Sequence, residues 1–113
     1  MKMPEATTQA RIVLTTAATA EEAARIGRIL VEERLAACAT ALPGVLSIYR
    51  WQGAVESAAE TLLLLKTGEA QLSALESRLL ALHSYETPEF LVLAVEAGSA
   101  GYLAWLQGCL GPA

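Results

Sequence analysis

The residues best suited to chemistry surround the only histidine of the chain. His83 lies in the segment LHSYETPE, and Tyr85, Glu86 and Glu89 follow it within six residues. A neutral imidazole near carboxylates can bind Cu²⁺ or Zn²⁺, although this spacing matches no closed metal motif. The alternative is structural, because a histidine at a helix end donates to the last carbonyls and complements the helix dipole. We favour the structural interpretation and keep His83 as the candidate metal ligand.

The other reactive side chains give weaker signals. Cys38 and Cys109 form no CxxC and no ligand-like spacing, and we expect buried, reduced thiols in a cytoplasmic protein. An aromatic and basic group could meet across one hairpin, with a cation over a ring, but ordinary cross-strand packing is the favoured interpretation. Its members are Tyr49, Arg50, Trp51 and Lys66. No nucleophile–base pair, phosphate-binding glycine loop or catalytic carboxylate pair is recognisable, so we expect no enzyme.

Composition restricts the elements that could position these residues. The chain has 113 residues, a net charge of −4 and 54% hydrophobic residues, which is typical of one folded domain. Without a basic run, nucleic-acid binding is not expected. Nor does any segment resemble a signal peptide or a membrane span of ~20 apolar residues, so no membrane partner is expected. We expect a flexible tail over residues 1–9 and a single domain over residues 10–113.

Hydrophobic periodicity predicts the element order β-α-β-β-α-β with a final helix. The predicted strands and helices cover residues 11–16, 20–34, 36–51, 61–66, 69–82 and 90–95, and the last helix begins after Ser99. Thr19 and Glu22 have the spacing of a capping box, in which each side chain bonds the backbone N–H of the other. This order is that of an α+β, ferredoxin-like fold with an antiparallel sheet covered by two helices.

The long hairpin from Leu35 to Lys66 organises the predicted fold. Its first arm would reach roughly 50 Å if unbroken, at ~3.3 Å per residue, and Pro43-Gly44 supplies a break. We expect a return loop at Gln52-Gly53 and residues 54–59. The second arm carries four consecutive leucines instead of alternating, so both of its faces must be covered. Two helices cover only one face, and a closed homo-oligomer would cover the other.

Several segments together resemble the CutA family of divalent-cation tolerance proteins. They are RLAACATALPGVLSIYRWQG (residues 34–53), LLLLKT (62–67), HSYETPEFLVLAV (83–95) and YLAWL (102–106). The resemblance implies a ferredoxin-like fold similar to the PII signalling proteins and a homotrimer joined through the long hairpins. It also implies a role in copper or other divalent-cation tolerance.

The resemblance bears on the candidate site residue by residue. In bacterial members associated with copper, a cysteine ends the first strand and a histidine pair closes the second helix. Here these positions are Thr15 and Leu82-His83, and Ser84 replaces the proline that usually follows. Only His83 carries over, so the resemblance implies at most weak binding of Cu²⁺ or Zn²⁺. The alternative function is a PII-like signalling or scaffold module that binds a small ligand or partner protein in inter-subunit clefts.

Overall fold

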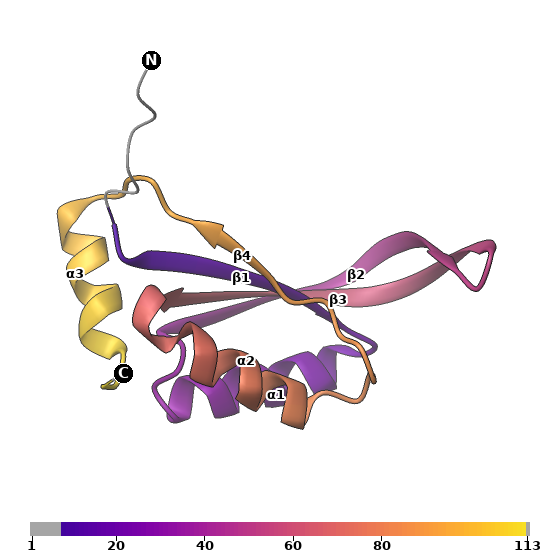
Figure 1. Ribbon diagram of the computed structural model, residues 1–113, viewed down its shortest axis with the longest axis horizontal. Helices are drawn as coiled ribbons and strands as arrows, with labels where there is room; N and C mark the ends of the chain where they lie inside the picture. Colours follow the sequence, from indigo (N-terminus) through magenta and orange to yellow (C-terminus); the bar gives the residue numbers. More distant parts are fainter. Residues whose placement is uncertain (1–7, 113) are drawn as a thin grey trace, which may run out of the picture.

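The order of strands and helices follows the prediction (Figure 1). The structure is a computed structural model that describes residues 8–112. Its elements are β1 (Ala10–Ala17), α1 (Ala20–Glu32), β2 (Cys38–Trp51), β3 (Ala54–Gly68), the 3₁₀ helix η1 (Glu69–Gln71), α2 (Leu72–Leu82), β4 (Leu91–Ala94) and α3 (Ala100–Cys109). Residues 1–7 of the predicted tail lie outside the described residues. Thr8 donates its hydroxyl to the Val95 carbonyl, and Gln9 accepts from the Glu69 N–H.

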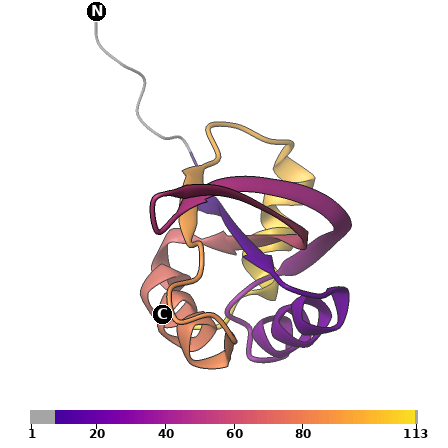
Figure 2. The same ribbon diagram turned by 90° about the vertical axis from the view of Figure 1, so that its right-hand side faces the viewer.

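The four strands form one antiparallel sheet in the order β2-β3-β1-β4. Helices α1 and α2 lie side by side on one face of this sheet, and α3 stands at the end remote from the hairpin tip (Figures 1 and 2). The predicted ferredoxin-like α+β fold is therefore confirmed. Among residues 8–112, no helix is long and apolar enough to cross a membrane.

The main core lies between the sheet and these two helices. In β3, Leu63 and Leu65 face the helices and are buried, whereas Leu62 and Leu64 point to the opposite face and stay partly exposed. This alternation is the period-2 geometry of a strand, and it leaves half of the leucine run uncovered. The buried cluster consists of Val13, Ile26, Leu30, Ala36, Leu63, Leu65, Leu75 and Leu79.

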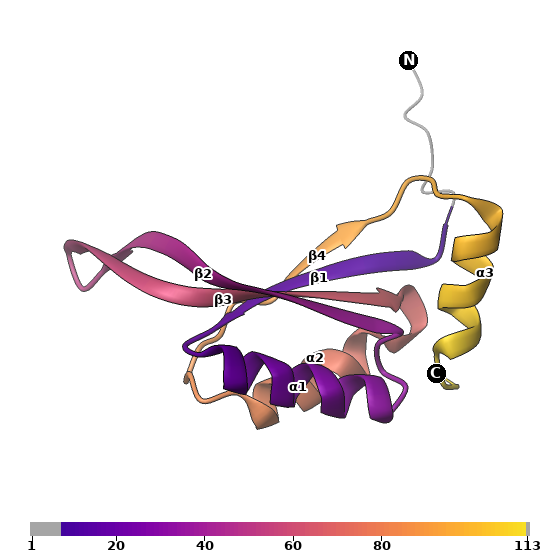
Figure 3. The ribbon, with the colours of Figure 1, turned by 180° about the vertical axis from the view of Figure 1, so that it is seen from behind.

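The hairpin bends where the sequence predicts a break. The β2–β3 register shifts between Leu42 and Val45, on either side of Pro43-Gly44, and Gly44 has a φ of 74°. Beyond this bulge the two strands leave the sheet as a bare ribbon (Figures 1 and 3). We call residues 45–59 the projecting ribbon.

The predicted return loop is too long. Only Gln52 and Gly53 form the turn, with φ values of 49° and 82°, the left-handed pair that suits a two-residue hairpin. Residues 54–59 belong to β3 and pair with β2 from Ala54 opposite Trp51 to Ala59 opposite Leu46. Their small and polar side chains indicated a loop, but ladder pairing with β2 overrides that weak local preference.

Local signals for helix packing are largely confirmed. The Thr19 hydroxyl accepts from the Glu22 N–H at 3.1 Å, which caps α1 as predicted. Gly27 marks a close approach of α1 to β2, because a Cβ there would lie 2.9 Å from the Ala39 Cβ. A smaller cluster joins α3 to the sheet end and consists of Ala10, Ala37, Leu106 and Leu110.

Candidate functional site

His83 directly follows the last residue of α2 and adopts extended backbone angles. Its side chain is fully buried. The Nε2 atom lies 2.7 Å from the Thr16 carbonyl oxygen at the end of β1, and Nδ1 lies 3.0 Å from the Tyr85 backbone nitrogen. The histidine therefore reaches across the sheet end to β1. We predicted that the ring would bond the last carbonyls of its own helix, and its hydrogen bonds go to Thr16 and Tyr85 instead.

These two partners determine the state of the imidazole ring. A carbonyl oxygen only accepts, so Nε2 carries the proton that bonds Thr16. A backbone N–H only donates, so Nδ1 offers its lone pair to Tyr85. The ring is the neutral Nε2–H tautomer, and each nitrogen already has a hydrogen-bond partner.

Glu22 of α1 also belongs to the cluster of side chains around His83. Its Oε2 accepts from the Ser84 N–H at 2.8 Å and lies 3.8 Å from Nδ1 of His83. The carboxylate therefore bonds the loop after α2, which the capping-box prediction missed. Burial raises the pKa of Glu22, but the hydrogen bonds from Ser84 and the backbone hydrogen bond from Ala18 outweigh burial and hold the pKa below its ordinary value.

Tyr85 extends the cluster to the hairpin. Its ring lies 4.7 Å from the His83 ring, centroid to centroid, and its hydroxyl donates to Glu60 Oε2 of β3 at 2.7 Å. Burial, followed by the bond to Glu60, raises the pKa of Tyr85 to about 12. The phenol therefore keeps its proton at physiological pH and acts as a donor to the carboxylate.

The carboxylates near His83 are not those proposed from the sequence. Glu86 and Glu89 follow it closely in the chain but are exposed. The sheet and α1 instead bring Glu60 and Glu22 to the cluster. Glu22 was recognised only as part of a helix cap, and Glu60 followed a segment interpreted as a loop, so no local pattern connected either residue with His83.

The donors at this site do not fit a resident divalent cation. Within residues 8–112, no three His, Cys, Asp or Glu side chains are grouped closely enough to hold one. The only imidazole lone pair is already bonded to the Tyr85 N–H. Thr15, at the family's cysteine position, is buried with its hydroxyl unpaired. We therefore describe the site as a closed hydrogen-bond cluster, and a metal role for His83 stays a prediction.

The proposed cation–aromatic group does not assemble across the hairpin. Tyr49, Arg50 and Trp51 lie opposite Glu56, Val55 and Ala54, so ordinary cross-strand pairing holds there. Lys66 lies opposite Cys38 near the start of β2. Its ammonium sits 5.6 Å from the Tyr102 ring centroid of α3, a cation–π contact that the sequence did not indicate.

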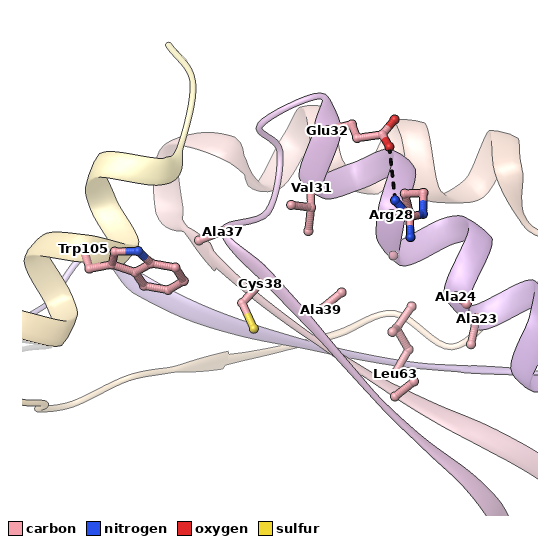
Figure 4. A pocket seen from close by; sticks show the side chains of 12 residues that line it. Ala23, Ala24, Arg28, Val31, Glu32, Ala37, Cys38, Ala39, Leu63 and Trp105 are labelled. Carbon is pink, nitrogen blue, oxygen red and sulfur yellow. Dashed lines mark ion pairs between the residues drawn. The ribbon is translucent and has the colours of Figure 1, made fainter.

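An open apolar groove of about 500 Å³ runs between α1 and the start of β2 (Figure 4). Trp105 of α3 and Cys38 stand on one side of it, and Arg28 and Glu32 form an ion pair at 3.8 Å on the other. Both Cys38 and Cys109 are half-buried free thiols.

The fold and the cluster together define a class of protein. A ferredoxin-like sheet, two covering helices and a projecting ribbon make a PII-like domain, and its buried histidine is engaged in structural hydrogen bonds. Residues 11–109 match the family described as CutA1 divalent ion tolerance protein. The chain belongs to this family.

Individual relatives agree along nearly the whole chain. The divalent-cation tolerance protein CutA of Thermus thermophilus is 47% identical over 96 residues, which cover 85% of this chain and 93% of the relative. The crystal structure of CutA from Xylella fastidiosa superposes with a TM-score of 0.89 at 40% identity and covers 92% and 100% of the two chains. That of CutA1 from Oryza sativa gives 0.91 at 35% identity and covers 96% and 100%.

Proposed function

We propose that this chain acts in divalent-cation tolerance as a homotrimeric, non-enzymatic protein of the cytoplasm that binds divalent cations weakly at most. The family and the names of its members support the tolerance role. These relatives are named as tolerance proteins, which supports a non-enzymatic function. The free thiols of Cys38 and Cys109 suit a reducing compartment.

The main support for a homotrimer is the apolar surface that a single chain leaves exposed on the sheet and on the ribbon. The sheet face opposite the helices presents Leu62 and Leu64, and its neighbours on β4, Leu91 and Leu93, are about half exposed. On the projecting ribbon, apolar side chains of both faces are exposed, among them Ile48 at 67% and Trp51 at 60%. Isolated two-stranded ribbons are marginal in water, and a patch of this kind marks an interface.

Assembly of copies around a closed axis would cover both surfaces at once. Each ribbon would pack on a neighbouring subunit, and the free edges of β2 and β4 would no longer face water. The number three comes from the family resemblance. Light scattering at micromolar concentration is expected to give about three times the chain mass of 11.9 kDa. A stable monomer would contradict the assembly.

Weak cation binding follows from the competition at His83. A cation that uses Nδ1 must displace the Tyr85 N–H, and within residues 8–112 the carboxylate recorded beside that nitrogen is that of Glu22, 3.8 Å away. Calorimetric titration with Cu²⁺ and Zn²⁺ is therefore expected to show weak heats at most, which disappear in His83→Ala and persist in the control Glu89→Ala. Tight binding at one ion per chain would refute this part of the proposal.

A second candidate function is a PII-like signalling or scaffold module. The groove between α1 and β2 favours it, because an apolar groove with a charged pair at its rim suits an amphipathic ligand. A thermal-shift screen of nucleotides and metabolites tests this function. A reproducible stabilisation that Trp105→Ala abolishes would support it, and a screen without any such compound would count against it.

A further inference from the structure

The cluster around His83 connects four elements that are far apart in the chain. The imidazole joins the end of α2 to the Thr16 carbonyl at the end of β1. The Ser84 N–H joins the same loop to Glu22 of α1. The Tyr85 hydroxyl then reaches Glu60 of β3. A chain of charge-assisted and neutral hydrogen bonds therefore runs from the sheet end to the hairpin.

These hydrogen bonds reach the hairpin at the base of the projecting ribbon. Glu60 pairs with Val45, which is the first pair beyond the bulge that begins at Leu42. On one side of this pair the strands lie in the part of the sheet that the helices cover, and on the other side they form the projecting ribbon (Figure 3). Bulges bend a strand and increase its twist, so a bond to Glu60 acts where the direction of the ribbon is set.

The family implies a cation at this place, and the residues of this chain disagree with that expectation. Both imidazole nitrogens have partners, and the nearest carboxylate is bonded to a backbone N–H. We propose that His83, Ser84 and Tyr85 form a metal-independent latch that holds the base of the projecting ribbon at a fixed angle to the helices. His83 is then a positioning residue, because it acts on the ribbon through Tyr85.

The latch accounts for the chemical nature of the side chains that form it. The buried, neutral imidazole fixes the Tyr85 backbone by accepting its N–H. The tyrosine spans the distance to β3 and keeps its proton, so it donates a strong bond to the Glu60 carboxylate. The latch itself does not depend on the proposed homotrimer, because all of its contacts lie within one chain. Only its effect on how the ribbon packs against a neighbouring subunit rests on that proposal.

Hydrogen–deuterium exchange on wild type and Tyr85→Phe tests the latch. The variant removes one hydroxyl and keeps the ring. Exchange in residues 45–59 is expected to become about two- to tenfold faster, the range that corresponds to one net hydrogen bond, with little change in the helix-covered segment 61–67. Glu60→Gln keeps an acceptor but loses the charge, so it should accelerate exchange less than Tyr85→Phe does. Unchanged exchange, or equal acceleration across ribbon and core, would overturn the latch.

Two further variants protect this test against a simple loss of folding. Glu60→Ala removes the other end of the same bond and should reproduce the effect of Tyr85→Phe, and the double variant should add little more. Additive effects would show that the two residues act independently, which would overturn the latch.

The NMR signals of the single imidazole ring test whether the latch is independent of metal. A long-range ¹H–¹⁵N spectrum contains one histidine ring, and it is expected to show the Nε2–H pattern and to change little with equimolar Zn²⁺. The other tautomer, or ring signals whose change saturates at one equivalent of Zn²⁺, would overturn the inference. The mass by light scattering tests the homotrimer separately, so failure of the latch and failure of the assembly are distinguishable.

Discussion

The helix-covered part of the sheet and the projecting ribbon share the strands β2 and β3, but their side chains have different surroundings. In the covered part, Leu63 and Leu65 of β3 meet two helices and are fully buried. In the ribbon, Ile48 and Val55 meet no helix and remain about two-thirds exposed. Backbone pairing continues unbroken in both regions apart from the bulge. Hydrogen bonding thus sets the shape of the ribbon, whereas its apolar side chains require a partner.

The largest effect on stability is expected in the core of the helix-covered part. Leu79 is completely buried against the sheet, and Leu79→Ala should lower the free energy of unfolding by about 2–5 kcal/mol, because it removes apolar contacts and leaves a cavity. Leu80 is its neighbour on α2 and 45% exposed, so Leu80→Ala should change stability little. Urea unfolding at matched protein concentration measures both. Similar losses in the two variants would mean that α2 is not packed as described.

In the ribbon a substitution should affect assembly more than folding. Ile48→Lys removes apolar burial of about 1.5–3 kcal/mol per subunit at a packed interface and adds a charge that is costly to bury. The mass by light scattering should fall, while the far-ultraviolet circular dichroism of the helices persists. The control is Glu76→Lys on the outer face of α2. If Ile48→Lys kept the assembly, the ribbon would not be part of the interface.

Gly27 tests how closely the covered part is packed. In Gly27→Ala, the new Cβ meets the Ala39 Cβ at 2.9 Å, and a strand backbone must shift to make room. We expect a loss of about 1–2 kcal/mol, in the lower range for overpacking. Gly101→Ala on α3 is the matched control, because open space surrounds that position and alanine favours a helix. Differential scanning calorimetry should show the first variant melting below wild type and the second at or above it.

The smallest expected effect is a gain. Thr15 is buried with its hydroxyl unpaired, so Thr15→Val should raise the free energy of unfolding by about 1 kcal/mol, as it removes an unsatisfied polar group. Thr67 is also buried on the helix side of the sheet, but its hydroxyl donates to the Leu35 carbonyl at 2.7 Å. Thr67→Val should therefore destabilise the protein. Equal signs for the two variants in denaturant unfolding would show that hydrogen bonding does not distinguish them.

Much of the fold could be predicted because it depends on local physics. The capping hydroxyl of Thr19 lies next to the N–H it serves, and Pro43-Gly44 interrupts a ladder wherever it stands. The segment 54–59 could not be assigned correctly, since alanine, serine and glutamate have weak strand preference. Only its register opposite Tyr49 and Ile48 makes it a strand.

The candidate site divides in the same way. The sequence by itself determined that His83 ends a helix, that four leucines occupy one strand, and that half of them need a cover beyond two helices. Only the tertiary structure decided the partners of His83 and Tyr85. Thr16 and Glu22 lie 67 and 61 positions away from His83, and Glu60 lies 25 positions away from Tyr85, so the crossing of strands and helices brings them together. Hydrogen bonds depend on ångström-scale positions in space. A pattern along the chain determines which residues face the core, but not which donor finds which acceptor.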